Sequence, residues 1–241
     1  MLWILLSLFF CWLIYREFRR CRVAPLGYDH PDPTPLSKPY LAILTVLSLL
    51  FAWPPFHYWQ FERLLSAKAT LLADKRPAKV HCNTIFDTFF DSNTLAAGHA
   101  DPNTGQIGIQ YPWCERLMDY LAHPSRASRE EIASLNLFTH ESMHVRGELD
   151  EALTECQAVQ RNFRAARLLG VPEQTARKTA LDYYHGDYLR RSTSGAMSAA
   201  YFSDQCAPGK AMDEHLGDSS WTSMTREGTY QNESDRNSPQ R

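Results

Sequence analysis

The chain has 241 residues, with 25 lysine or arginine and 27 aspartate or glutamate side chains, so its formal net charge is -2 at pH 7. This balance favours neither a nucleic-acid partner nor a strongly acidic one. The charges are unevenly distributed, because residues 1–15 and 39–61 contain none, whereas the remainder is polar and long enough for one domain.

The two uncharged stretches predict two membrane helices and therefore a lipid bilayer as a partner. As a helix, the first stretch is only about 22 Å long, whereas the bilayer core is about 30 Å thick. Extension of the helix to Phe18, with the arginine side chains snorkelling to the interface, would allow it to span the core. The second stretch is long enough, and its Trp53 and Trp59 resemble the aromatic belt of a membrane interface. Pro54 and Pro55 predict a kink or a helix end near that interface.

Basic residues indicate an orientation for this region. Lysine and arginine number five in residues 16–38 and five in residues 62–79, so the loops alone do not decide it. Four arginines follow the first helix and no charged side chain precedes them, which favours a cytoplasmic first loop and both termini outside. We expect a two-pass cell membrane protein. Its segments would be a membrane helix with basic flank at 1–22, a loop at 23–38, a second membrane helix at 39–61 and a linker at 62–77.

Residues 78–216 are expected to form one extracytoplasmic domain, followed by a disordered polar tail at 217–241. Within the domain, residues 78–82 and 106–111 have strand character, and a helix is expected through 113–121. Pro172 predicts the start of a further helix that runs to about Arg190. We expect packing or surface positions, without a catalytic role, for the residues Tyr183, Tyr184 and His185 on that helix.

His140, Glu141 and His144 form an HExxH motif, which on a helix places two imidazoles one turn apart, where both can bind one zinc ion. Glu141 would then be the general base. Zinc lowers the pKa of its water and the carboxylate takes the proton, which is what peptide hydrolysis at neutral pH requires. Ser128 with Glu131 predicts a capping box at the start of this helix, and Gly147 predicts its end.

A second amphipathic helix is predicted after Gly147 and is expected to end at Gly170. Apolar residues recur there at helical spacing, at Ala152, Cys156, Val159, Phe163 and Ala166. Two helices joined by so short a turn fold back as an antiparallel pair, so residues equidistant from the turn face one another. This arrangement places Glu151 near His144 and Glu155 near His140.

Residues 150–155, Asp-Glu-Ala-Leu-Thr-Glu, resemble the N-E-x-x-S-D segment of thermolysin-like gluzincins, zinc peptidases in which this glutamate is the third metal ligand. The resemblance implies that Glu151 completes a ligand set with His140 and His144, and that Glu155 fixes the tautomer of His140. It covers the sixteen residues 140–155, and the spacing to the third ligand is much shorter than gluzincins usually have. It also implies that residues 106–111 line the cleft and pair with substrate.

His144, Gly147 and Asp150 also satisfy HExxHxxGxxD, the pattern of metzincins with aspartate in place of the usual third histidine. In that interpretation Asp150 is the ligand. Metzincins also have a methionine-containing turn beneath the metal, and neither Met197 nor Met212 stands in a convincing setting for one. We favour Glu151, because the metzincin interpretation leaves the pair of acids, Glu151 and Glu155, unexplained.

Cysteine usage bears on the compartment. Cys11 and Cys21 belong to the amino-terminal part, which leaves four cysteines in the domain and three ways to pair them. We expect the disulfides Cys82–Cys114 and Cys156–Cys206 and hence an oxidising compartment, with free buried thiols as the alternative.

The sequence thus predicts a mainly helical α+β fold, in which two amino-terminal membrane helices precede a small zincin-like domain with a hairpin of site helices and a short sheet. The predicted function is that of a membrane-anchored zinc metallopeptidase, a hydrolase of peptides or proteins in which Glu141 activates a zinc-bound water. The alternative is a non-catalytic membrane-tethered binding or structural module whose metal site is stabilising or vestigial. An intramembrane protease is disfavoured, because charged residues flank the motif at Arg129, Glu130, Glu131 and Arg146.

Overall fold

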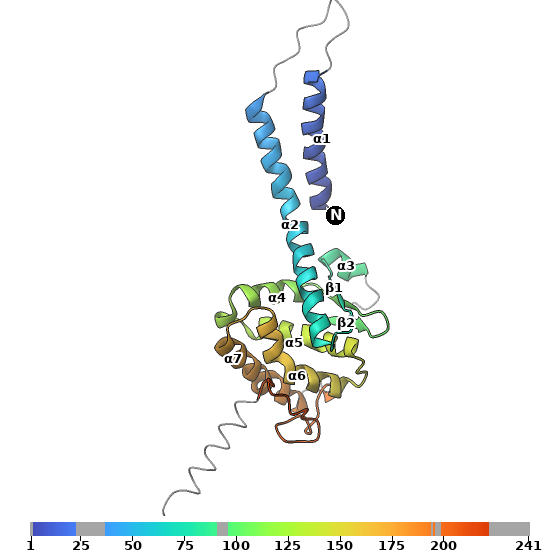
Figure 1. Ribbon diagram of the computed structural model, residues 1–241, viewed down its shortest axis with the longest axis vertical. Helices are drawn as coiled ribbons and strands as arrows, with labels where there is room; N and C mark the ends of the chain where they lie inside the picture. Colours follow the sequence, from blue (N-terminus) through green and yellow to red (C-terminus); the bar gives the residue numbers. More distant parts are fainter. Residues whose placement is uncertain (1, 23–36, 91–95, 194, 196–198, 222–241) are drawn as a thin grey trace, which may run out of the picture. The chain divides into compact units, whose positions relative to one another are not determined.

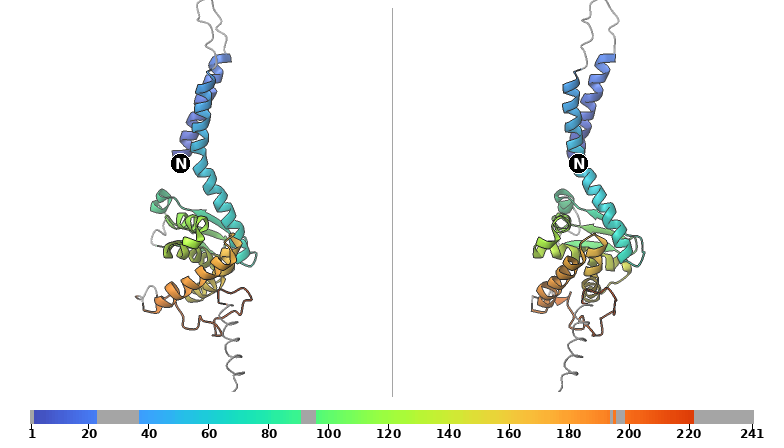
Figure 2. Two further views of the ribbon diagram at one scale, coloured as in Figure 1. Left: turned by 90° about the vertical axis from the view of Figure 1, so that its left-hand side faces the viewer. Right: turned by 60° about the vertical axis from the view of Figure 1, so that its left-hand side comes forward.

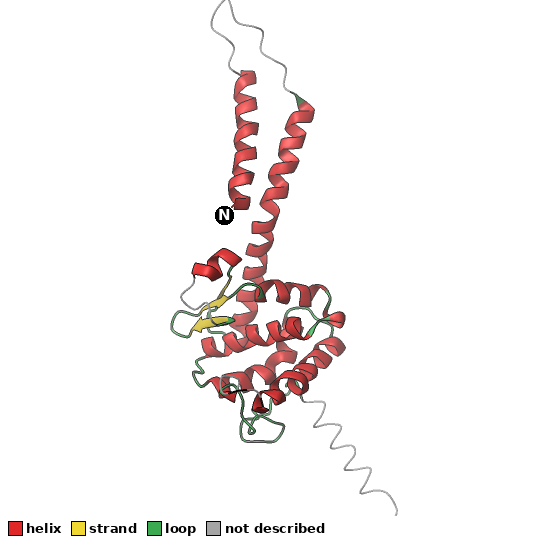
Figure 3. Ribbon diagram, turned by 180° about the vertical axis from the view of Figure 1, so that it is seen from behind, coloured by secondary structure: helices red, strands yellow, loops and turns green. Residues whose placement is uncertain are grey.

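A computed structural model describes residues 2–22, 37–90, 96–193, 195 and 199–221 (Figure 1). By its internal contacts the chain divides into two compact units, Met1–Phe61 and Glu62–Arg241. Most of the expected loop at 23–38 and of the expected tail lies outside the described residues. The described part is mainly helical with one small sheet, as predicted (Figure 3).

Two helices make up the first unit, α1, Leu2–Arg22, and the greater part of α2, Lys38–Leu72. They contact one another through small polar groups: Ser7 Oγ donates to the Ser48 carbonyl at 3.1 Å, and Cys11 Sγ lies 3.0 Å from Ser48 Oγ. Phe10 also stacks on Phe51, with 5.4 Å between ring centroids. Small polar contacts of this kind join helices in lipid. Most large apolar side chains of both helices are exposed, so the pair presents an apolar surface.

Only one of the two predicted membrane spans has the length and composition to cross a bilayer. Among the described helices, α2 alone is long and apolar enough. The prediction that the first segment spans the membrane is therefore wrong, although the segment is helical. The uncharged residues 2–15 rise only about 21 Å, and Arg16, Glu17 and Arg19 follow within one turn. Charged side chains thus occupy the length that an apolar span would need.

α2 extends beyond the second membrane segment predicted at 39–61. Pro54 and Pro55 lie inside the helix without ending it, because a proline pair removes only two backbone donors and the bonds on either side persist. Residues 62–72, expected to belong to a linker, continue the helix. Leu65, Ala69 and Leu72 fall on one face and are fully buried in the second unit. The end of α2 is thus part of the core of that unit.

The second unit contains a sheet of three strands, β1, Lys79–Cys82, β2, Gly98–Asp101, and β3, Gln106–Ile109. Their order is β1-β3-β2, with β1 parallel and β2 antiparallel to β3. β1 and β3 lie where the sequence predicts strands. β2 is not predicted, because its sequence, Gly-His-Ala-Asp, has no β-branched residue and no apolar alternation. The expectation that residues 106–111 pair with a substrate is wrong, because β3 is the central strand and both its edges are paired.

Helix α5, Arg129–Arg146, lies at the centre of the second unit and contacts strands β2 and β3 and helices α4, α6 and α7 (Figure 2). The predicted helix after Pro172 begins as an α-helix and ends as one π-helical and one 3-10 segment, Tyr184–Tyr188 and Leu189–Thr193. The bounds of the remaining helices are Ile85–Phe90 for α3, Trp113–Ala122 for α4, Pro124–Arg126 for a 3-10 turn, Glu151–Leu168 for α6 and Glu173–Tyr183 for α7.

Two disulfides join elements of the second unit, and both predicted pairings are confirmed. Cys82–Cys114 joins the end of β1 to the start of α4, and Cys156–Cys206 joins α6 to the segment 199–221. Disulfides are typical of oxidising compartments. Residues 217–221, expected to begin the disordered tail, instead pack on α6: Trp221 is buried, and the Ser220 amide donates to the Gln160 carbonyl at 2.8 Å. The large apolar indole of Trp221 packs in the core, and the polar composition of the surrounding residues gives no sign of this contact.

Candidate metal centre

The HExxH motif lies on α5, whose two ends are fixed as the sequence predicts. At the start, Ser128 Oγ accepts from the Glu131 amide, and the Glu131 carboxylate accepts from the Ser128 amide at 2.9 Å. At the end, Gly147 has a φ of 114°, in the left-handed region that glycine tolerates. His140 and His144 therefore lie one turn apart on a well-defined helix, and their Nε2 atoms approach to 3.1 Å.

A short turn brings α6 back against α5. Glu148 orders this turn, because its Oε1 accepts from the amides of Leu149 and Asp150 at 3.0 and 3.1 Å. Asp150 Oδ1 accepts from the Leu153 amide at 2.8 Å, so Asp150, the ligand in the metzincin interpretation, uses its carboxylate as the cap of α6. Glu151, the first residue of α6, is the acid that joins the two histidines in one group.

The three atoms of this group, His140 Nε2, His144 Nε2 and Glu151 Oε2, form a nearly equilateral triangle. Glu151 Oε2 lies 3.2 Å from His140 Nε2 and 3.5 Å from His144 Nε2. Ligand atoms bound at about 2.0 to 2.2 Å are about 3.3 to 3.6 Å apart in a tetrahedral site and about 2.8 to 3.1 Å apart in an octahedral one. The edges of the triangle thus have the size expected for ligands of one metal ion, and they extend from the octahedral to the tetrahedral range. It is the one such group in the part of the chain that the structure describes.

Both histidines turn Nε2 toward the triangle because Nδ1 is engaged elsewhere. His144 Nδ1 lies 2.8 Å from the Glu148 carbonyl oxygen, which can only accept, so Nδ1 carries the proton. His140 Nδ1 lies 2.8 Å from Glu155 Oε2 and donates to it. In the neutral rings both Nε2 atoms are then unprotonated acceptors. Two such nitrogens and a carboxylate oxygen would repel one another at this distance, and a proton on one Nε2 or a bound metal ion would remove the repulsion.

The electrostatics of these side chains also favour positive charge at the triangle. Burial lowers the pKa of His140, but hydrogen bonds to Glu151 and Glu155 outweigh it and raise this pKa to about 10. The hydrogen bond to His140 in turn lowers the pKa of Glu151 below its ordinary value. The site therefore stabilises positive charge, which a proton or a metal ion can supply.

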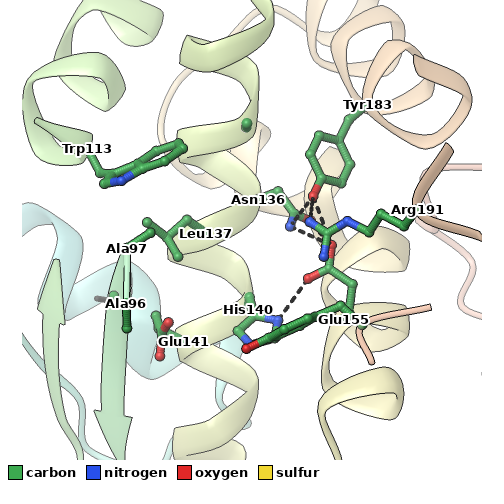
Figure 4. A pocket seen from close by; sticks show the side chains of 13 residues that line it. Ala96, Ala97, Trp113, Asn136, Leu137, His140, Glu141, Glu155, Tyr183 and Arg191 are labelled. Atoms are coloured by element: carbon green, nitrogen blue, oxygen red, sulfur yellow. Dashed lines mark hydrogen bonds and ion pairs between the residues drawn. The ribbon is translucent and has the colours of Figure 1, made fainter. Parts of the chain in front are cut away.

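Glu155 is 2% exposed and is held by a polar network (Figure 4). Its Oε1 accepts from Asn136 Nδ2 at 2.9 Å and from the Tyr183 hydroxyl at 2.8 Å, and it lies 3.1 Å from Arg191 Nη2. Burial raises the pKa of Glu155, but the hydrogen bond to His140 and the charge of Arg191 outweigh it and hold the pKa below its ordinary value. The carboxylate is thus ionised, and it fixes the Nδ1–H tautomer of His140.

Glu141 points away from this network, toward the edge strand β2 (Figure 4). Its side chain is buried, and its Oε2 has no hydrogen-bond partner among the described residues. Burial raises the pKa of Glu141, the charge of His140 opposes the rise, and the result is about 7. A carboxylate with an uncommitted oxygen and a pKa near neutrality is suited to proton transfer.

A cavity of about 290 Å³ opens beside His140 and Glu141. Apolar side chains line one side of it, and the network of Glu155 lines the other (Figure 4). The ring of Tyr201 also lines it, 5.7 Å from the ring of His140. The apolar side consists of Ala96, Ala97, Trp113 and Leu137.

Sequence reasoning missed four residues of this site. Asn136 could have been found, because it lies one turn before His140 on the same face of the site helix. Gly98, Arg191 and Tyr201 reach the site only through the fold, from the edge strand, the 3-10 segment after α7 and the segment bound by the second disulfide. No local spacing links any of these three to the motif.

Gly98→Ala is expected to lower the free energy of unfolding by about 1 to 2 kcal/mol, because the site has no room for a methyl group. An added Cβ would lie 3.0 Å from Glu141 Oε1 and 3.2 Å from the Gly108 carbonyl oxygen. Chemical denaturation measures the effect. Gly186→Ala is the control, since an added Cβ there meets nothing within 4 Å. Equal stability of the two variants would contradict the close approach of β2 to Glu141.

The aromatic residues of the predicted third helix take different positions. Tyr184 packs on Tyr188 and Trp221, with ring centroids 5.9 and 5.3 Å away, and His185 is exposed. Tyr183 is buried as a member of the Glu155 network instead of an apolar cluster. None of the three belongs to the group of metal-binding atoms.

Comparison of the chain with family models, with curated proteins and with solved structures found no match. The interpretation of the site therefore depends on its own chemistry. That chemistry is a His, His, Glu group that can hold a metal ion, with a buried carboxylate next to it.

Proposed function

We propose that this protein is a membrane-anchored zinc metallopeptidase. His140, His144 and Glu151 would hold Zn²⁺, Glu141 would be the general base, and Glu155 would orient His140. One observation carries the proposal. Two imidazole Nε2 atoms and a carboxylate oxygen converge at 3.1, 3.2 and 3.5 Å, beside a buried carboxylate that has an uncommitted oxygen.

The donor set favours zinc among the common metal ions. Two imidazole nitrogens and one carboxylate oxygen suit a cation of intermediate softness, whereas Mg²⁺ and Ca²⁺ take oxygen ligands. Three protein ligands leave a fourth position open, which is typical of catalytic zinc sites and not of structural ones. When bound, zinc would polarise the scissile carbonyl and lower the pKa of a water molecule.

The side chains around the ligands would supply the remaining chemistry. Glu141 would take the proton from the attacking water and deliver it to the leaving nitrogen. The pKa of this carboxyl group is about 7, and a divalent cation in the site would lower it, so that Glu141 would be ionised and able to accept a proton at neutral pH. The adjoining cavity of about 290 Å³ has room for a substrate side chain next to the scissile bond.

Two features support a location for this protein, α2 and the disulfides. α2 has the length and composition of a membrane anchor, and both disulfides lie in the second unit. We therefore place the second unit outside the cytoplasm, because disulfides are typical of oxidising compartments. The substrate would be a peptide or protein in that oxidising space.

The purified, detergent-solubilised protein is expected to bind about one zinc ion per chain, measured by elemental analysis after gel filtration. A chelator should lower its thermal unfolding temperature, because a metal that binds only the folded state stabilises it. His144→Ala should lose the metal. His123→Ala, which removes an exposed histidine of the same unit, should retain it. Wild-type protein without stoichiometric zinc, or His144→Ala with it, would refute the proposed site.

A further inference from the structure

The turn after α2 has an unusual backbone and packs against the connection between α5 and α6. Asp74 and Lys75 have φ angles of 54° and 70°, so two consecutive residues other than glycine are left-handed. Hydrogen bonds within the chain hold this conformation: the Lys75 amide donates to the Thr70 carbonyl at 2.8 Å, and the Arg76 amide to the Ala73 carbonyl at 3.1 Å. The turn therefore has a defined shape that directs the side chain of Arg76.

Arg76 completes the carboxyl end of the site helix. The last carbonyls of an α-helix have no donor within the helix. For Val145 and Arg146 the amides that would continue the helix are those of Leu149 and Asp150, and these donate to the Glu148 side chain instead. Arg76 Nη1 supplies the missing donor, at 3.2 Å from the Val145 carbonyl oxygen and 3.0 Å from that of Arg146.

The guanidinium group also lies directly against the turn. A Cβ added to Gly147 would lie 2.7 Å from Arg76 Nη1. Asp74 provides a second connection, because its Oδ2 accepts from Arg146 Nε at 2.6 Å. Arg146 Nη1 donates to Gln157 Oε1 at 3.0 Å, and Gln157 Nε2 in turn donates to Glu148 Oε2 at 3.3 Å. Both connections thus end on the turn between α5 and α6.

This turn determines where two of the three candidate ligands point. The Glu148 carbonyl accepts from His144 Nδ1 at 2.8 Å and so sets the orientation of that ring. The Glu148 side chain orders the amides up to Asp150, and Glu151 follows as the first residue of α6. A shift of the turn would therefore move His144 and Glu151 together, while His140 is held separately by Glu155.

We propose that Arg76, assisted by Asp74, is a positioning residue of the metal site, so that the turn after α2 supports the geometry of that site. The inference rests on the proposed function, because it requires that His144 and Glu151 bind a metal ion. Arg76 contacts neither the metal-binding atoms nor the cavity beside Glu141. It acts through the Gly147 to Asp150 turn, as partners behind a ligand do in other metal sites.

Arg76→Met tests this proposal, because it keeps an apolar stem of similar length and removes every donor. In full-length protein in detergent, the affinity for Zn²⁺, measured by competition with a chromophoric chelator, is expected to fall about 10-fold to 100-fold. The visible absorption of the Co²⁺-loaded protein should also change, because the ligand geometry is altered. Lys75→Met is the matched control, since it removes the same charge from the neighbouring exposed residue and should leave both quantities unchanged.

Arg76→Lys, with a single donor group on a shorter stem, should bind zinc with an affinity between those of wild type and Arg76→Met. Unchanged zinc affinity and an unchanged Co²⁺ spectrum in Arg76→Met would overturn the inference while leaving the proposed function intact. An equal loss in Lys75→Met would overturn it too, because the effect would then come from charge. If Arg76→Met does not fold, wild-type affinity in Arg76→Lys overturns it. Wild-type protein that binds no zinc would refute the proposed function itself, and the inference with it.

Discussion

Glu141→Gln is expected to abolish peptide hydrolysis while zinc binding is retained. The amide has the shape of the carboxylate and fits the same buried position, but it cannot take a proton from water. Loss of a general base typically slows a reaction by about 10²-fold to 10⁴-fold. Glu141 is not one of the three grouped metal-binding residues, so about one zinc ion per chain should remain. Cleavage of a mixture of synthetic peptides by the zinc-loaded protein, followed by mass spectrometry, measures the rate.

Glu130→Gln is the matched control for this experiment. It makes the same chemical change on the same helix, at a side chain that is 68% exposed and pairs with Arg116, and it should leave the rate unchanged. Persistent cleavage by Glu141→Gln would exclude Glu141 as the base. Zinc binding without cleavage by the wild type would favour a stabilising or vestigial metal site. In that case His140→Ala should chiefly lower the unfolding temperature.

The parts of the site that the sequence predicts are those that local rules determine. The spacing of His140 and His144, the capping box at Ser128 and the stop at Gly147 each act within a turn or two of helix, where geometry follows from residue order. The short turn after Gly147 then brings Glu151 and Glu155 to the histidines, because a hairpin of two helices has few arrangements. Both disulfide pairings also fit the predicted organisation.

The parts that escape prediction depend on contacts between distant segments. Arg191 reaches Glu155 from the irregular turns after α7. Arg76 reaches α5 through two hydrogen bonds that join residues 69 and 70 positions apart in the sequence. Gly98 is recognisable only once β2 packs beside Glu141, and its strand carries no apolar pattern. The error at α1 has a local cause: its uncharged start predicts a membrane span, whereas the charged side chains in its last turns interrupt the apolar length that a span needs. Hydropathy alone does not decide such a helix.

Glu155→Ala is expected to lower the free energy of unfolding of the metal-free protein by about 3 kcal/mol. Removing one member of a buried ion pair leaves its partner charged and unpaired, which typically costs about 3 to 5 kcal/mol. The lower end applies because the Arg191 side chain is 24% exposed, so water can reach it. Asn136 and Tyr183 would also lose their common acceptor. Denaturant unfolding in the presence of a chelator measures this effect without a contribution from metal.

Glu155→Gln separates the two roles of this carboxylate. The amide oxygen can still accept from Asn136 and Tyr183, so the loss of stability should be smaller than in Glu155→Ala. Its nitrogen, facing His140 Nδ1, would instead donate and favour the tautomer that carries its proton on Nε2, the atom that must be free to bind metal. Zinc affinity should therefore fall by about 10-fold to 100-fold in both variants. Glu173→Gln, at an exposed position of α7, should change neither quantity. Wild-type zinc affinity in Glu155→Gln would mean that His140 needs no partner to present Nε2, and Glu155 would then act only on stability.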